Sequence, residues 1–87
     1  MRDALAEHLT GRGLSVRWVA CLAAVERVEG ARVYRCNVNF GDPHIQIYCA
    51  TLLRGRLLEA EWRQAVHGVQ NRVAAARECA ARLRAGG

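Results

Sequence analysis

The sequence predicts an α+β fold: a short N-terminal helix, a three- or four-stranded antiparallel meander and a long C-terminal helix packed on one sheet face. Two observations predict it. Between Val33 and Leu53 apolar and polar residues alternate around a cluster of turn residues, the period-two pattern of a half-buried hairpin. In the last third, apolar residues recur at spacings of three and four, as in an amphipathic helix. The 87 residues suffice for one domain, residues 1–87, with a modest core.

The first predicted element is a helix over residues 2–10. Leu5 and Leu9 stand four apart, which places them in one apolar stripe. Gly11 and Gly13 follow, and glycine is the usual residue for the left-handed conformation that closes a helix. We therefore expect the helix to end at these glycines.

Residues 14–29 carry conflicting signals. The start of this segment alternates as a strand would, yet its apolar residues also fit helical spacing and its alanines favour a helix. We predict a strand to about Cys21, a break over residues 22–24 and a second extended piece. The reason is Glu29-Gly30, a glycine-containing turn between two runs rich in valine.

The central hairpin is the clearest local prediction. Its first arm has one apolar and one polar face: Tyr34, Cys36, Val38 and Phe40 against Arg35, Asn37 and Asn39. Its second arm, residues 45–51, is rich in β-branched and aromatic residues, which pack well in sheets. Asp42 and Pro43 suit the first two positions of a type I turn between the arms.

The C-terminal third predicts one continuous helix over residues 59–83. Its apolar stripe repeats at intervals of three and four: Trp62, Val66, Val69, Val73, Ala76, Ala80 and Leu83. Such a helix spans roughly 37 Å, against about 20–23 Å for a short strand, so it should overhang the sheet. Because helices on one side leave the other side free, we expect an open sheet face.

Composition and charge narrow the class of protein. Apolar residues make up 52% and charged residues 24%, close to a globular average, so disorder is not expected. The net charge is +5, and every basic residue is an arginine. Charged residues interrupt the first 13 positions, and the longest apolar run, residues 18–25, is far too short to span a membrane. We expect a cytoplasmic protein without a membrane segment.

The four cysteines allow two interpretations. In a reducing cytosol they are small buried apolar residues with free thiols. Cys21 and Cys36 flank a predicted turn. If the domain lies outside the cytosol, a disulfide between them would stabilise the fold by roughly 3 kcal/mol. No two cysteines form the close pair that is typical of structural zinc, so no metal site is predicted.

No catalytic motif is present. Asp42 and His44 offer a carboxylate and an imidazole, but their place on a tight turn favours a capping role for Asp42. The chain has no nucleophile motif, phosphate-binding loop or dinucleotide fingerprint. We predict no enzyme activity and no cofactor. The leading hypothesis is a non-enzymatic protein-interaction or regulatory module that forms a homodimer through its overhanging, alanine-rich helix.

A nucleic-acid-binding domain is the first alternative. The order helix, β-meander, helix, and the alanine-rich end NRVAAARECAARL, resemble the double-stranded-RNA-binding domain. That family carries a basic cluster where this chain reads Leu58-Glu59-Ala60-Glu61, so another surface would be needed: sheet arginines with Tyr48 or Trp18 stacking on a base. The binding residues predicted for either kind of partner are Arg17, Arg35, Asn37, Asn39, Tyr48, Arg54 and Arg56.

A second resemblance covers residues 14–58. The cysteine pair around the Val28-Glu29-Gly30-Ala31 turn, followed by two more strands, is similar to small actinobacterial extracytoplasmic domains of unknown function. In those domains such a pair forms a bridge. The resemblance implies a further alternative, an extracytoplasmic domain with a Cys21–Cys36 disulfide.

Overall fold

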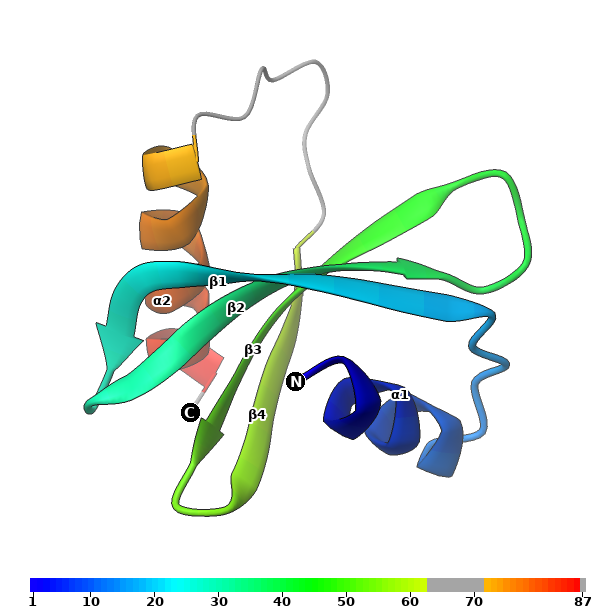
Figure 1. Cartoon of the computed structure of the whole chain (residues 1–87), viewed down its shortest axis with the longest axis horizontal. Helices are drawn as coiled ribbons and strands as arrows, with labels where there is room; N and C mark the ends of the chain where they lie inside the picture. Colours follow the sequence, from blue (N-terminus) through cyan, green and yellow to red (C-terminus); the bar gives the residue numbers. More distant parts are fainter. Residues whose placement is uncertain (63–71, 87) are drawn as a thin grey trace.

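The structure is a computed structural model that describes residues 1–62 and 72–86. Its elements are α1 (Arg2–Gly11), β1 (Trp18–Val28), β2 (Ala31–Asn39), β3 (Ile45–Leu53), β4 (Arg56–Trp62) and α2 (Arg72–Gly86). The strands form one antiparallel sheet in the order β1-β2-β3-β4 (Figure 1). The predicted α+β class and antiparallel meander are therefore confirmed, with four strands.

Two hairpins depend on residues with left-handed backbone. Glu29 and Gly30, between β1 and β2, have φ of 49° and 84°, and Arg54 and Gly55, between β3 and β4, have φ of 53° and 79°. Two successive positive φ values give the turn whose twist matches that of the flanking strands. The predicted Glu29-Gly30 turn is confirmed, and the ambiguous segment before it is a strand.

The strand β1 is continuous but not regular. Its register against β2 shifts between Ala23 and Arg27, next to the break that the sequence predicts at residues 22–24. In its first half the side chains alternate between the two sheet faces, as in a regular strand: Val19 and Cys21 face α1, while Trp18 and Leu22 face away from it.

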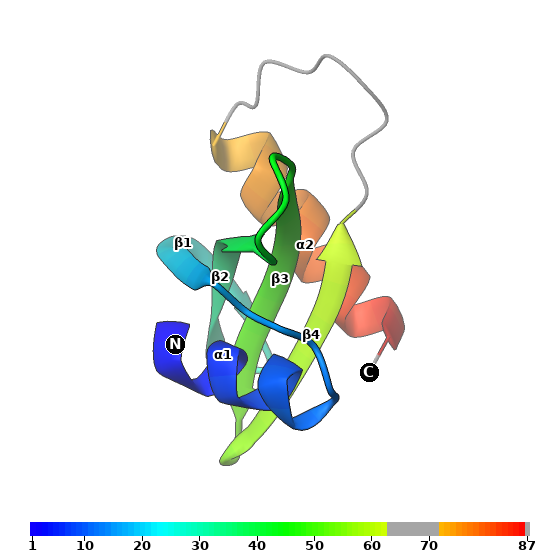
Figure 2. The same ribbon diagram turned by 90° about the vertical axis from the view of Figure 1, so that its right-hand side faces the viewer.

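A helix lies on each face of the sheet, as Figure 2 shows. On one face, Leu5 and Leu9 of α1 are fully buried against strand residues, namely Val19, Cys36, Val38 and Tyr48. On the other, Cys79, Ala80 and Leu83 of α2 form a second cluster with Val28, Val33 and Cys49. The prediction of helices on only one face is wrong, because β2 and β3 present apolar residues on both faces.

The prediction of one long helix over residues 59–83 is also wrong. Residues 56–62 form β4, whose pairing with β3 runs from Arg56↔Leu53 to Trp62↔Ile47, and α2 has only 15 residues. In β4, the alternate residues Leu58 and Ala60 are half-buried and pack against the α2 cluster. The packing predicted through Trp62, Val66, Val69 and Val73 concerns side chains outside those that the structure describes.

Two disulfides link secondary-structure elements to one another. Cys21 and Cys36, directly opposite each other in β1 and β2, are bridged, and Cys49 of β3 is bridged to Cys79 of α2. No cysteine is free, so the prediction of free buried thiols is wrong. The bridges close loops of 15 and 30 residues. The loop-entropy relation gives stabilisations of about 3 and about 4 kcal/mol for loops of these lengths.

Removing the bridge between β3 and α2 tests its contribution to stability. The double change Cys49→Ala and Cys79→Ala is expected to lower the free energy of unfolding by roughly 3–4 kcal/mol, because it opens the 30-residue loop. Urea unfolding followed by circular dichroism measures the loss. Leu52→Ala, at a side chain 44% exposed, is the control and should change it by less than about 0.5 kcal/mol. A double-variant loss below about 1 kcal/mol would contradict the loop-entropy argument.

Candidate functional site

The residues predicted to bind a partner do not form one patch. Arg17 is exposed at the end of the sheet where Trp18 pairs with Asn39 and Asn39 pairs with Ile45. Arg54 and Arg56 are exposed at the opposite end of the sheet, where Leu53 pairs with Arg56. A ligand on one side of the sheet therefore cannot use all these arginines at once.

Arg35 and Asn37 share the sheet face of α2. They pair with Cys49 and Ile47 of β3, and both are half-buried. Tyr48 is on the face of α1, since it pairs with Cys36. The structure thus brings Arg35 and Asn37 together and separates them from Tyr48.

Asn39 shapes the turn between β2 and β3. It is 8% exposed, its Nδ2 donates to the Asp42 carbonyl at 2.9 Å, and its Oδ1 accepts from the Gly41 backbone N–H at 2.9 Å. Asp42 Oδ1 accepts from the His44 backbone N–H at 2.9 Å, as expected for a capping role. Asn39 is thereby engaged in the hairpin rather than presented to a partner.

The turn contacts of Asn39 predict a stability effect. Asn39→Ala removes both hydrogen bonds, so the free energy of unfolding is expected to fall by about 1–3 kcal/mol. Thermal unfolding measures it. Asn37→Ala, at the neighbouring half-buried site on the same face, is the control. Equal losses of stability in the two variants would contradict the role of Asn39 in stabilising the turn.

Tyr48 is buried beneath α1 and is not available to stack on a base. Its side chain is 5% exposed, and its ring meets that of Phe40 edge-on with centroids 6.4 Å apart. Burial raises the pKa of the Tyr48 phenol, the Glu61 and Glu59 carboxylates raise it further, and Arg12 lowers it.

An ion-pair cluster beside Tyr48 ties α1 to β4. Arg12 Nη1 donates to Glu59 Oε1 at 2.9 Å, and His8 Nε2 lies 3.6 Å from the same oxygen. The Glu59 side chain is 14% exposed, whereas Arg12 is more than half exposed, so solvent screens the pair and its net contribution is small. The arrangement positions a helix; it does not present a nucleophile.

The raised pKa of Tyr48 predicts a loss of stability in alkali. The unfolded phenol ionises near pH 10, before the folded one, so the free energy of unfolding is expected to fall as the pH rises past about 10. The chain has no lysine and its cysteines are bridged, so few other groups titrate there. Tyr48→Phe should flatten this pH dependence in urea titrations from about pH 9 to 11. An unchanged slope would contradict the assignment.

Sequence reasoning missed the exposed apolar side chains of β1 and of the start of β3. Trp18, Leu22 and Val25 of β1 are 43%, 61% and 86% exposed, and Ile45 of β3 is 45% exposed. We call Trp18, Leu22 and Val25 the β1 apolar edge. The signal was present as the uncharged run of residues 18–25, but only the strand order places that run at an edge of the sheet.

The described part of the chain contains neither a candidate metal site nor a candidate membrane-spanning helix. Among residues 1–62 and 72–86, no three His, Cys, Asp or Glu side chains gather where they could hold a metal ion. No helix in those residues has the length and apolar character needed to cross a membrane. The β1 apolar edge is therefore the surface from which we argue function.

Comparison with known proteins found no relative of this chain. No protein-family model matches the chain, and neither a curated protein nor a solved structure is significantly similar to it.

Proposed function

We propose that the chain is a non-enzymatic protein-interaction module that self-associates through the outer edge of β1. The observation that carries the proposal is the exposure of the β1 apolar edge, 43% at Trp18 and 61% at Leu22. An edge strand offers unpaired backbone groups, and proteins usually protect such edges with charge, proline or a bulge. Residues 18–25 contain neither charge nor proline, and the register shift comes only after Ala23.

The other edge of the sheet is protected in the usual way. The strand β4 carries Arg56, Glu59 and Glu61, and charged side chains discourage pairing with another strand. This difference between the two edges favours β1 as the surface of association. It also replaces the overhanging helix as the dimer surface, because α2 is short and its Ala80 is 1% exposed within the core.

A second copy of β1 complements the first. In antiparallel pairing about a two-fold axis at Ala20, Trp18 of each copy stands opposite Leu22 of the other. Cross-strand aromatic and aliphatic pairs are favourable, and no like charges meet in this register. The two sheets would then continue as one across the axis.

The disulfides support a location outside the cytosol. Both bridges join buried or half-buried cysteines, and disulfides persist mainly in oxidising compartments. We therefore favour the extracytoplasmic alternative over the cytoplasmic location expected from the sequence. For a chain of 87 residues, two bridges compensate for a small core.

Nucleic-acid binding is the second candidate. Arg17 and Trp18 are consecutive and both exposed, which favours it, since proteins that bind single strands combine cations with aromatic side chains. The burial of Tyr48 and the separation of Arg17 from Arg54 weigh against it. Retention of DNA or RNA that falls steeply between about 50 and 200 mM salt would support it.

A charge-swap experiment tests self-association. Ala20→Glu places two carboxylates opposite each other at the axis and is expected to weaken the dimer by about 100-fold or more, because juxtaposed like charges cost several kcal/mol. Ala20→Arg should act likewise, and mixing the two variants should restore a heterodimer. Light scattering after size exclusion measures the masses, with Leu52→Glu, at an exposed position of β3, as the control. A monomeric native protein at about 100 µM, well above a micromolar Kd, would overturn the proposal.

A further inference from the structure

We infer that the Cys21–Cys36 disulfide is a site of thiol–disulfide exchange with an external dithiol, whereas Cys49–Cys79 is a fixed structural link. The inference goes beyond self-association and holds for a monomer as well as for a dimer. It begins from exposure: Cys36, Cys49 and Cys79 are each 0% exposed, but Cys21 is partly exposed. Only one of the two bridges therefore contains a partly exposed cysteine.

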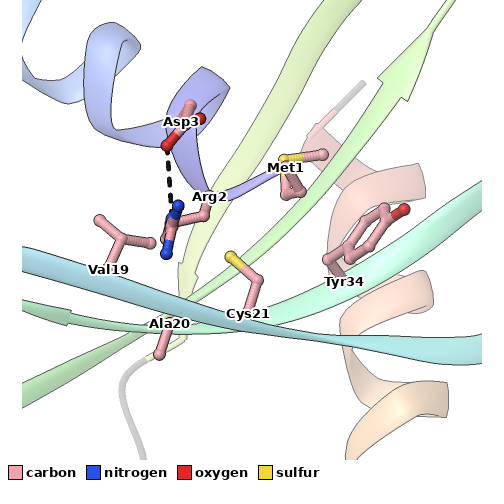
Figure 3. Close-up of a pocket in the computed structure, with 7 residues that line it drawn as sticks. All are labelled: Met1, Arg2, Asp3, Val19, Ala20, Cys21 and Tyr34. Carbon is pink, nitrogen blue, oxygen red and sulfur yellow. Dashed lines mark hydrogen bonds and ion pairs between the residues drawn. The ribbon is translucent and has the colours of Figure 1, made fainter.

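Cys21 borders a hollow beside the first turn of α1. The hollow has a volume of about 500 Å³ and is lined by Met1, Arg2, Asp3, Val19, Ala20, Cys21 and Tyr34. Figure 3 shows the Cys21 side chain rising from β1 toward Met1 and Arg2. Because β1 is an edge strand, paired only with β2 in the described sheet, no further strand lies between this sulfur and the open side.

The second bridge is enclosed on every side that the structure describes. Cys49 belongs to β3, which has β2 and β4 as neighbours, and Cys79 lies on the inner side of α2. Ala80 and Leu83, 1% and 2% exposed, belong to the same cluster. A reductant can attack this bridge only after α2 has separated from the sheet, so its reduction requires partial unfolding.

Access, not charge, decides the difference between the bridges. Arg2 is the basic residue of the hollow, and a cation favours an approaching thiolate. Its Nε lies 3.3 Å from Asp3 Oδ1, with both side chains mostly exposed, so solvent and the carboxylate screen its charge. The partial exposure of Cys21 at the hollow is therefore the feature that selects it.

The exchange is a two-electron reduction by a dithiol. One thiolate of the dithiol attacks Cys21 Sγ, the Cys21–Cys36 bond breaks, and its electron pair goes to Cys36 Sγ, which takes up a proton. The second thiol then loses its proton and attacks the dithiol's own sulfur in the mixed disulfide. This step releases Cys21 as a thiolate, which takes up a proton, and leaves the dithiol oxidised to a cyclic disulfide. The protein ends with two thiols, and β1 is held to β2 by hydrogen bonds and packing alone.

Timed reduction and alkylation test the inference. The native protein, at a concentration where it is monomeric, is treated with dithiothreitol, quenched with iodoacetamide and digested, and each cysteine is followed by mass spectrometry. Cys21 and Cys36 are expected to be alkylated at least tenfold faster than Cys49 and Cys79. Equal rates for the two pairs, or earlier reduction of Cys49–Cys79, would overturn the inference.

Two variants identify the route and separate this inference from self-association. Tyr34→Ala opens the hollow and should speed reduction of Cys21–Cys36 several-fold, with Cys49–Cys79 as an internal control for general unfolding. A Tyr34→Ala protein in which both bridges speed up equally would show that unfolding governs reduction and would contradict the route. Leu22→Glu, at a position opposite Trp18 in the proposed dimer and outside the lining of the hollow, should keep the tenfold difference even if its mass is unchanged from the native protein, so failure of the dimer proposal and failure of this one are distinguishable.

Discussion

Strand β3 has buried side chains on both of its faces, and the rest of the structure depends on this. Tyr48 on one face and Cys49 on the other are 5% and 0% exposed, and Ala50 and Thr51 repeat the alternation at 0%. The Thr51 hydroxyl donates to the Arg32 carbonyl at 2.7 Å, so its burial leaves no polar cost. A strand of this kind is stable only between neighbours and under cover on both sides, which β2, β4 and the two helices supply.

Because both faces of the sheet are covered, the exposed apolar surface lies at an edge of the sheet and not on a face. Once α1 and α2 lie on opposite faces, the exposed apolar residues concentrate toward β1. The strand β4 closes the other side with charged side chains, so the two edges differ in chemistry. The surface available to a binding partner therefore consists of the backbone groups and apolar side chains of one strand, and not of an open sheet face.

The small size of the domain explains why two covalent links accompany the two cores. Among the side chains that the structure describes, each helix buries a few residues, Leu5 and Leu9 in α1 and Cys79, Ala80 and Leu83 in α2. A chain of this length buries a smaller share of its surface than a larger domain. The Cys49–Cys79 bridge holds α2 on the sheet, and the Cys21–Cys36 bridge holds the edge strand. Unequal exposure of the sulfurs gives the two links different chemical access.

The sequence by itself determined the elements whose signals are local. The Leu5 and Leu9 stripe, the alternation of residues 34–40 and the Glu29-Gly30 and Asp42-Pro43 turns each depend on spacing or backbone preference within a few residues. The burial of Leu5 and Leu9, the strand over the alternating residues and the Glu29-Gly30 turn are confirmed, and Asp42 Oδ1 accepts from the His44 backbone N–H. Only the tertiary structure decided that residues 56–62 form a strand, that Cys49 meets Cys79 and that Trp18 and Leu22 lie on an edge. Each of these depends on which distant segment becomes the neighbour, and periodicity along one chain carries no information about that pairing.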